Sequence, residues 1–247
     1  MQKTKIAAAL ALMTSTVFST AFATPVTFFG EDINTGGPSN SPLTAFPNSD
    51  AASSSFLSNL SGVGTETFEA PDQMVGETPP IVLTFPGAGT ATLNGSGQVQ
   101  AGNDGAGRYP ISGSQYYYAG TSDFSVAFSS PIAAFGFYGV DIGDYGGHLT
   151  LTLTDTSNVT STITVPNQTS LGGEINGSVL YFGFYDTGDQ YTNISFGNDS
   201  GGNDVFAFDN MTIGSLEQVR PVPEPATLAL LGLGLAGLGL TRRKIRA

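Results

Sequence analysis

The stretch that decides the fold is His148-Leu-Thr-Leu-Thr-Leu-Thr154, in which leucine and threonine alternate without interruption. Successive side chains of an extended strand point to opposite faces, so this pattern predicts a strand with leucine toward a core and threonine toward solvent. A second strand-like run, Val159 to Val165, follows after the polar turn Asp155 to Asn158. Together the two segments predict an antiparallel hairpin.

The same pattern of strand and turn fills most of the chain. Runs of β-branched and aromatic residues are separated by Gly, Pro, Asn and Asp at a spacing of roughly 8 to 12 residues. This predicts an all-β fold, an antiparallel two-sheet sandwich of jelly-roll type, with a closed barrel as the alternative. The expected strands lie near 26–30, 65–69, 81–85, 90–93, 98–101, 115–118, 124–128, 132–140, 148–154, 159–165, 178–185, 191–196 and 204–213.

One short N-terminal helix is expected within this β pattern. Ser49 is the predicted N-cap, and Asp50 suits the positive end of the helix. Ala52, Phe56 and Leu60 fall toward one face, and Gly62 follows the predicted end. The spacing predicts a helix of about 10 to 12 residues.

The N-terminus has the features of an export signal. Two cations in Met1–Lys5 precede the apolar run Ile6–Met13, and Ala21-Phe-Ala23 is a small-residue cleavage site. This predicts a signal peptide at 1–23, cut between Ala23 and Thr24, with signal peptidase and the secretion translocon as partners. The mature body is expected to be one β-sandwich domain at 24–219.

The C-terminal segment 220–247 predicts a sorting signal with a transmembrane helix. Pro221-Val-Pro-Glu-Pro225 precedes the apolar run Ala226–Leu240, and a basic tail follows. At about 1.5 Å per residue the run spans roughly 22 Å, short of a hydrocarbon core of about 30 Å, so the anchor would be marginal. The cations orient the tail toward the cytoplasm and leave the body outside.

From Val222 to Lys244 the tail resembles the PEP-CTERM sorting signal of Gram-negative bacteria nearly residue for residue. The resemblance implies that an exosortase-type membrane peptidase recognises Pro223, Glu224 and Pro225. It also implies transient anchoring, followed by release or attachment at the cell surface, commonly in bacteria that make exopolysaccharide. It covers about a tenth of the chain.

The body also resembles exported PEP-CTERM proteins without assigned activity. The segments that carry this likeness are Phe29-Gly-Glu-Asp32, the helix region from Asn48 to Glu69, Ala134 to Asp144, and Asp204 to Ile213. This resemblance implies an exported β-sandwich and no particular chemistry.

Charge excludes one class of partner. Between Thr24 and Val219 the chain has one cation, Arg108, and 19 acids, for a net charge of −18. A surface this negative repels nucleic acid and attracts cations. Cysteine is absent, so the exported body has no disulfides and depends on packing or on metal.

Calcium is the expected cation, because hard cations take several oxygen ligands. Glu31 and Asp32 follow the first strand and Asp209 lies on the last, and terminal strands often neighbour one another in sandwiches. The segment from Phe208 to Ile213 also resembles the last strand of carbohydrate-binding jelly rolls, in which the aspartate helps to hold calcium. In the alternative interpretation, Glu31 and Asp32 form a solvated turn and Asp209 accepts hydrogen bonds from nearby backbone N–H groups. Second candidates are Asp141 with Asp144, and Asp199 with Asp204.

The sequence offers little for catalysis. His148 is the only histidine and begins a strand, so a Ser-His-Asp triad would depend on it entirely. A carboxylate pair for glycoside cleavage stays open, but no spacing singles one out. We therefore expect no enzyme.

Sugar binding would need an exposed aromatic surface, which Tyr116 to Tyr118, Tyr181, Tyr185 and Tyr191 could supply. Alternation places Tyr117 on the opposite face from its neighbours. We expect a surface or extracellular-matrix protein with a structural or adhesive role in exopolysaccharide or biofilm. A calcium-stabilised carbohydrate-binding module is the first alternative, and a secreted glycan-active enzyme is the second.

Replacing Pro223, Glu224 and Pro225 together by alanine should block processing of the tail, because the sequence that the peptidase reads is gone. We expect unprocessed precursor in the membrane fraction, measured by immunoblotting of membrane and medium. Equal processing of mutant and wild type would contradict the sorting interpretation.

Overall fold

The computed structural model describes residues 24–35, 40–71, 73–120, 124–143, 146–169, 176–199 and 204–220. The predicted signal peptide and the Pro-Glu-Pro tail, with its expected transmembrane helix, lie outside these ranges. Within them, no helix is both long and apolar enough to cross a membrane.

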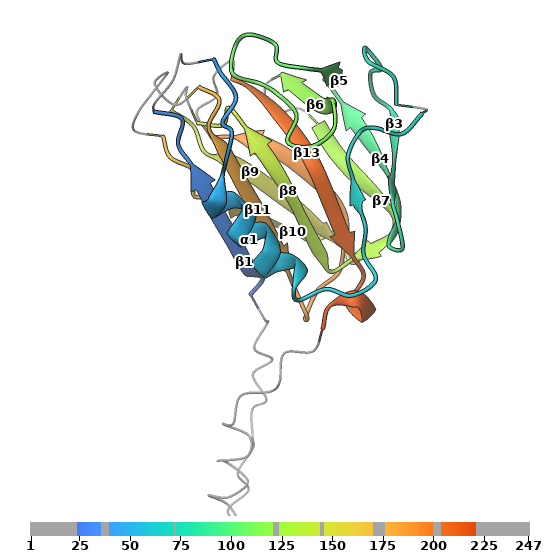
Figure 1. The fold of residues 1–247 in the computed structure, drawn as a ribbon. Coiled ribbons are helices and arrows are strands. Elements are labelled where there is room, and N and C mark those ends of the chain that lie inside the picture. The colour runs from blue at the N-terminus through green and yellow to red at the C-terminus, as the bar shows by residue number, and fades with distance from the viewer. Residues whose placement is uncertain are drawn as a thin grey trace, which may run out of the picture.

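The body is a sandwich of two antiparallel sheets (Figure 1), which confirms the predicted fold class. From β7 to β13 the chain passes back and forth between the sheets, as it does in jelly rolls. Neither sheet closes on itself or joins the other, so the barrel alternative is wrong. The seven-stranded sheet has the order β1 (Val26–Asp32), β11 (Val179–Tyr185), β8 (Ala134–Val140), β13 (Val205–Gly214), β6 (Gln115–Gly120) and β5 (Gln98–Ala101), with β2 (Thr65–Glu66) also paired to β13. The six-stranded sheet has the order β10 (Thr160–Thr164), β9 (Leu149–Asp155), β12 (Tyr191–Asn198), β7 (Phe124–Ile132), β4 (Gly89–Gly95) and β3 (Ile81–Phe85).

The predicted hairpin is β9 with β10. Thr162 lies opposite Thr152, and Ile163 lies opposite Leu151. Leu149, Leu151 and Leu153 are fully buried between the sheets, whereas the threonines of both strands point outward. The alternation read from the sequence therefore fixes which side of this sheet faces the core.

Phenylalanine fills the space between the sheets. The rings of Phe124 and Phe196 stack with centroids 4.2 Å apart, and Phe208 meets both of them edge to face at 5.0 and 5.3 Å. Such aromatic pairs add to the stability gained by burying their apolar area. The body therefore holds together without disulfides or tryptophan.

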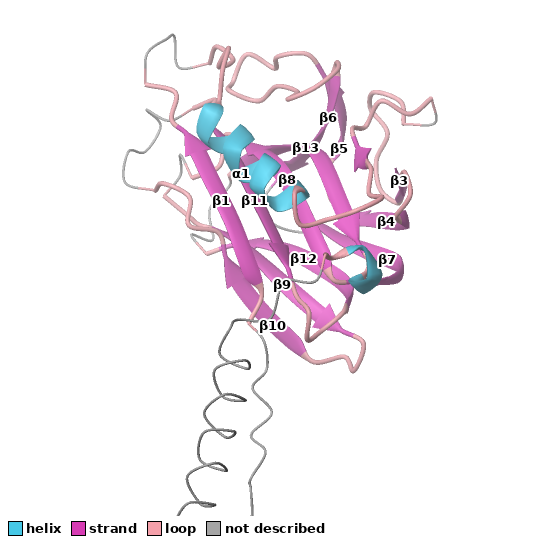
Figure 2. Ribbon diagram, turned by 60° about the horizontal axis from the view of Figure 1, so that its bottom comes forward, coloured by secondary structure: helices cyan, strands magenta, loops and turns pink. Residues whose placement is uncertain are grey.

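A third layer covers the outer face of the seven-stranded sheet. Helix α1 (Pro47–Leu57) lies across β1 and β11 (Figure 2). Its Phe56 ring packs on Gly183 and Gly136, where an added Cβ would meet the ring at 3.0 and 2.9 Å. Glycine is needed at both positions because the helix approaches the sheet so closely.

The helix is found where the sequence predicts it, but Ser49 is not its N-cap. The helix starts at Pro47, whose fixed φ suits the first helical position. Asp32, at the end of β1, accepts hydrogen bonds from the N–H groups of Asn48 at 3.2 Å and Ser49 at 2.8 Å. The free N–H groups of the first turn are thus satisfied by another strand, and the Ser49 hydroxyl donates to the same carboxylate at 2.9 Å.

Both ends of the described body lie at one end of the sandwich. β1 begins there, and the 3₁₀ helix η2 (Leu216–Gln218) ends there (Figure 1). Val219 forms a bridge with Leu60, and the N–H of Arg220 donates to the Asn59 carbonyl at 2.8 Å. These contacts fix the point at which the chain leaves the body toward its tail.

Asp32→Asn should lower the free energy of unfolding by about 1–3 kcal/mol, because the amide N–H₂ would face N–H donors that now bond to a carboxylate. Glu217→Gln makes the same charge change on an exposed side chain and should have little effect. Denaturant unfolding of the exported protein measures both changes. Equal stability of the two variants would contradict the role of Asp32.

Candidate functional site

The three predicted calcium ligands do not form one site. β11 and β8 lie between β1 and β13, so the expected adjacency of the first and last strands is wrong. Asp32 caps α1, whereas Asp209 bonds to the 111–112 backbone. Calcium binding stays a prediction, but Glu31, Asp32 and Asp209 do not supply a shared site for it.

Asp209 is fully buried and holds a loop against β13. One oxygen accepts the N–H groups of Ile111 at 2.8 Å and Ser112 at 3.0 Å, and the other accepts the N–H of Asn210 at 2.7 Å. Burial raises the pKa of Asp209 to about 7, although these three N–H groups act to lower it. The alternative interpretation of Asp209, as an acceptor of backbone hydrogen bonds, fits this geometry.

Glu31 also has a raised pKa. Its carboxylate accepts the N–H of Gln168 at 2.9 Å. Burial raises its pKa to about 7, and the neighbouring Asp32 acts in the same direction. Both Glu31 and Asp209 therefore take up protons in the folded body well above the pH at which exposed carboxylates do.

The second candidate acids lie in other arrangements. Asp141 is buried with φ +68° and accepts hydrogen bonds from the N–H of Gly177 at 2.9 Å and the Arg108 guanidinium at 3.2 Å. Arg108 also bonds to Asp104 at 2.6 Å. Asp204 is buried at the start of β13, and Asp144 lies outside the described residues. No three His, Asp or Glu side chains of the described body gather closely enough to hold a metal ion.

His148 lies at the surface, just before β9. Asp199 accepts its backbone N–H at 2.6 Å and lies 3.1 Å from its ring nitrogen. The side chains are 39% and 48% exposed, so this pair ties two surface segments together.

Five of the six tyrosines expected to offer an aromatic surface are buried, and the sixth, Tyr118, is half-buried with the Arg108 guanidinium over its ring. Tyr116, Tyr181 and Tyr185 pack beneath α1 and its neighbouring loops, whereas Tyr117 and Tyr191 point into the core between the sheets. All five are at most 5% exposed. These five cannot stack on a sugar in this conformation.

The outer face of the six-stranded sheet is an uncharged surface, which we call the neutral face. The strand register places hydroxyl, methyl and amide groups in rows across it. Neighbouring strands are about 4.8 Å apart, and alternate residues of one strand are about 6.7 Å apart. The neutral face consists of Val82, Thr84, Thr90, Thr92, Asn94, Ser125, Ala127, Thr150, Thr152, Thr154, Thr160, Thr162, Thr164, Asn193, Ser195 and Gly197.

None of these residues is ionisable, although the body has a net charge of −18. The hydroxyls of Thr152 and Thr162 lie 3.5 Å apart across the hairpin, and the Asn193 amide donates to Ser195 at 3.1 Å. The face can therefore make neutral hydrogen bonds and methyl contacts over several strands. It has no group for acid–base or nucleophilic chemistry.

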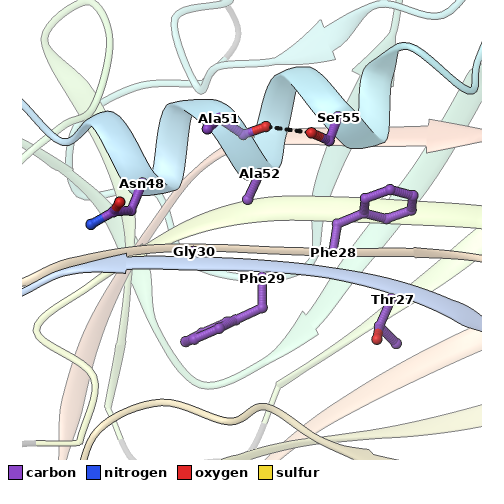
Figure 3. Close-up of a pocket in the computed structure, with 8 residues that line it drawn as sticks. All are labelled: Thr27, Phe28, Phe29, Gly30, Asn48, Ala51, Ala52 and Ser55. Carbon is purple, nitrogen blue, oxygen red and sulfur yellow. Dashed lines mark hydrogen bonds between the residues drawn. The ribbon is translucent and has the colours of Figure 1, made fainter.

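A groove of about 440 Å³ lies between α1 and β1 (Figure 3). Phe28 lies on the helix side of β1 and Phe29 on the opposite side, and the Ser55 hydroxyl donates to the Ala51 carbonyl at 2.8 Å. Gly30 forms the floor, where an added Cβ would lie 2.1 Å from the Asn48 carbonyl oxygen. The lining has no ionisable side chain, so the groove has no group for acid–base catalysis or for binding a charged ligand by an ion pair.

Sequence reasoning oriented the threonines of β9 and β10 correctly but did not treat them as a site. The available signal was the Thr-x-Thr-x-Thr pattern of both strands, together with the absence of acids among the outward positions. The contribution of β3, β4, β7 and β12 depends on strand order, which the sequence does not give.

The fold and the neutral face define a β-sandwich domain in which the outer face of one sheet is uncharged. A C-terminal tail follows this domain in the sequence. Residues 221–244 match the model of the PEP-CTERM protein-sorting motif. The tail thus carries a PEP-CTERM sorting motif, which supports export and processing by an exosortase-type membrane peptidase. No curated protein matches the chain.

Several solved structures are similar to the body at low identity. The K2 cleaved adhesin domain of Lys-gingipain is 16% identical, with a TM-score of 0.37, over 61% of this chain and 97% of that one. A family 22 carbohydrate-binding module of Clostridium thermocellum Xyn10B is 15% identical, with a TM-score of 0.33, over 65% and 97%. The CBM22-1 xylan-binding domain of Paenibacillus barcinonensis Xyn10C is 14% identical, with a TM-score of 0.35, over 64% and 94%. Likenesses at these TM-scores carry no weight for ligand or activity.

The body should become more stable as the pH falls from 8 to 5.5. The folded-state pKa values of Glu31 and Asp209 lie above those of the unfolded chain, so the folded state binds protons more tightly. Their stabilising effect is complete below the unfolded pKa values and is lost as the pH rises through about 7. Melting temperatures of the exported protein at fixed ionic strength measure this trend.

Asp209→Asn should flatten that pH profile, because the variant cannot titrate at this position. Glu217→Gln removes one exposed carboxylate and should leave the profile unchanged. A melting temperature that decreases as the pH is lowered from 8 to 5.5 would contradict the raised pKa values of Glu31 and Asp209.

Proposed function

We propose that the protein is an exported, non-catalytic component of the cell surface or extracellular matrix. In this role it contacts neutral polysaccharide through the neutral face. The observation that carries the proposal is the placement of a continuous uncharged face on a body with a net charge of −18. The PEP-CTERM tail supports the location, because it supports export and processing at the membrane.

Charge determines which polymers can approach this surface. Anionic polysaccharide is repelled by the acidic body, whereas a neutral glycan meets no such barrier. On the neutral face the glycan hydroxyls would meet threonine, serine and asparagine side chains without placing a charge in a dry interface. A neutral polymer is therefore the class that the surface fits.

The buried tyrosines shape the expected affinity. Without an exposed aromatic platform, each contact would be a neutral hydrogen bond or a methyl contact, and such hydrogen bonds contribute about 1 kcal/mol each. One body would therefore bind weakly. Many copies held at one surface would bind strongly together, because each further contact is made at a high effective concentration. This suits adhesion and structural support better than capture of a soluble sugar.

The body is also joined to its tail in a way that suits display. The chain enters β1 and leaves after η2 at the same end of the sandwich (Figure 1). A body held by its tail would keep that end toward the membrane and leave the neutral face at its side, open to surrounding polymer.

The double variant Thr92→Glu with Thr152→Glu should weaken retention of the exported protein on cellulose and cross-linked dextran by about tenfold, because it buries charge against a neutral polymer. The control Ser54→Glu with Ser55→Glu places the same two negative charges on exposed positions of α1, on the other side of the molecule, and should not weaken retention. Co-sedimentation with each polymer, and with alginate gel as the anionic comparison, measures these effects.

Equal retention of the wild type and the double variant, or stronger binding to alginate than to the neutral polymers, would overturn the proposed face. Release of soluble sugar from a polymer, lost when one acid is changed, would favour the glycan-active enzyme instead.

A further inference from the structure

Each sheet ends in two edge strands, whose outward backbone groups have no neighbouring strand. Such an edge is a template for pairing with another chain unless it is protected. Apart from the two-residue strand β2, which pairs only with β13, the sandwich has four edges, formed by β1 and β5 in one sheet and by β3 and β10 in the other. Three of them are occupied by identifiable groups.

The edges of β5 and β3 are closed by hydrogen bonds. Val99 of β5 donates its N–H to the Glu77 carbonyl at 2.9 Å and accepts the Gly76 N–H at 2.8 Å. On β3, the Glu66 carboxylate accepts the N–H of Thr84 at 2.7 Å, and Gln73 donates to the Val82 carbonyl at 3.2 Å. Neither strand offers these groups to another chain.

The edge of β1 is covered in its second half by α1. The Asn48 side chain donates to the Glu31 carbonyl at 3.1 Å, and the Ser49 hydroxyl lies 3.3 Å from the Gly30 carbonyl oxygen. The helix backbone also sits directly on Gly30. A strand added here would have to displace the helix.

The fourth edge strand, β10, pairs with β9 on one side and has no strand on its other side within the described part of the chain. The pairs Asp155 with Val159 and Leu149 with Val165 are hydrogen-bonded. Hydrogen-bonded and non-hydrogen-bonded pairs alternate along an antiparallel ladder, so Ser161 and Ile163 bond toward β9. The N–H and C=O groups of Thr160, Thr162 and Thr164 therefore point outward.

This open edge also lacks the usual protective features of an edge strand. Thr160 to Thr164 contains no charge, no proline and no bulge, and every side chain except Ile163 is exposed. Pro166, just after the strand, limits the open stretch to these residues. Val159, beside the strand, is 63% exposed.

We propose that β10 pairs antiparallel with β10 of a second copy of this chain, centred on Thr162. In that register Thr162 faces its own counterpart, and Thr160 faces Thr164 of the other copy. Each of the three threonines would donate one hydrogen bond and accept one. The exposed Val159 would come opposite Val165 of the other copy, on the inner side of the sheet.

The charges around β10 favour this partner. In the two-fold arrangement, the Asp155 turn of each copy lies beside residues 165–168 of the other, which contain no acid. Residues 159–165 contain no acid, so the paired strands bring no carboxylates face to face. The Glu31 carboxylate, which accepts the Gln168 N–H at 2.9 Å, lies at the margin of this contact. Side chains of paired antiparallel residues lie on the same face, so the two neutral faces would form one continuous surface.

The pairing is closed and weak. A two-fold contact uses the open edge of both copies, so assembly stops at a dimer and does not grow into a fibre. An interface of one short strand pair is smaller than that of typical stable complexes, so pairing would depend on the high local concentration at a cell surface. The inference does not depend on polysaccharide binding, and its test uses no polymer.

Cysteine cross-linking tests the proposal, since the natural chain has no cysteine. Full chain carrying Thr162→Cys, expressed in cells that export and process it, should give cross-linked dimer with a short bis-maleimide. The facing Cα atoms of a hydrogen-bonded pair lie about 5.5 Å apart. Thr92→Cys lies on β4 of the same face, away from the edge, and serves as the matched control. We expect at least tenfold more dimer for Thr162→Cys.

The register and the edge can be tested separately. A mixture of Thr160→Cys and Thr164→Cys proteins should cross-link more than either protein alone. Thr162→Pro, added to the Thr160→Cys and Thr164→Cys pair, should abolish that cross-linking with little change in melting temperature, because the Thr162 N–H points away from β9. Dimer yields equal to those of Thr92→Cys, or cross-linking unaffected by the proline, would overturn the proposal.

Discussion

The shortage of cations in the body determines how its buried charges are stabilised. Residues 24–219 contain one arginine and 19 acids. The carboxylates of Asp32, Glu66 and Asp209 are nevertheless buried. A buried carboxylate is costly unless it is paired or hydrogen-bonded. Here backbone N–H groups replace cations: Asp32 holds the start of α1, Glu66 holds β3, and Asp209 holds the 111–112 loop. Each acid thereby joins two segments that are distant in sequence.

This use of carboxylates also explains where charge is missing. Acids at strand ends and in loops can reach the free N–H groups of neighbouring turns, as Asp155 does with Ser157 and Val159. In the middle of the six-stranded sheet the backbone groups already bond to neighbouring strands, so a carboxylate there would find no such donors. Threonine, serine and asparagine occupy those outward positions instead. The acids therefore lie where free N–H groups are available, and the outward positions of the six-stranded sheet carry uncharged side chains.

Local periodicity carried most of the fold. Leu149, Leu151 and Leu153 alternate with threonine, and this alone oriented β9 and its hairpin partner. The sites were harder to predict, because the partners of Asp209 lie 97 and 98 residues away and strand order decides which acids meet. Ser49 is of a residue type that commonly caps helices, but the sequence does not show that the Asp32 carboxylate accepts the N–H groups at the start of the helix. The burial of Tyr181 depends on α1 lying across the sheet, which no local pattern indicates.

Three of the four sheet edges are also protected without a cation. Glu66 closes β3 with a carboxylate, residues 76–77 close β5 with backbone groups, and α1 covers the second half of β1. Proteins commonly protect the remaining edge with lysine, but this body has no lysine, and β10 has neither a charge nor a proline of its own. The net charge of −18 restrains indiscriminate association at long range, whereas the contact surface of β10 is itself uncharged. Repulsion between bodies and attraction between edges therefore act at different distances, and a short, uncharged edge on a strongly acidic body favours one defined pairing over general aggregation.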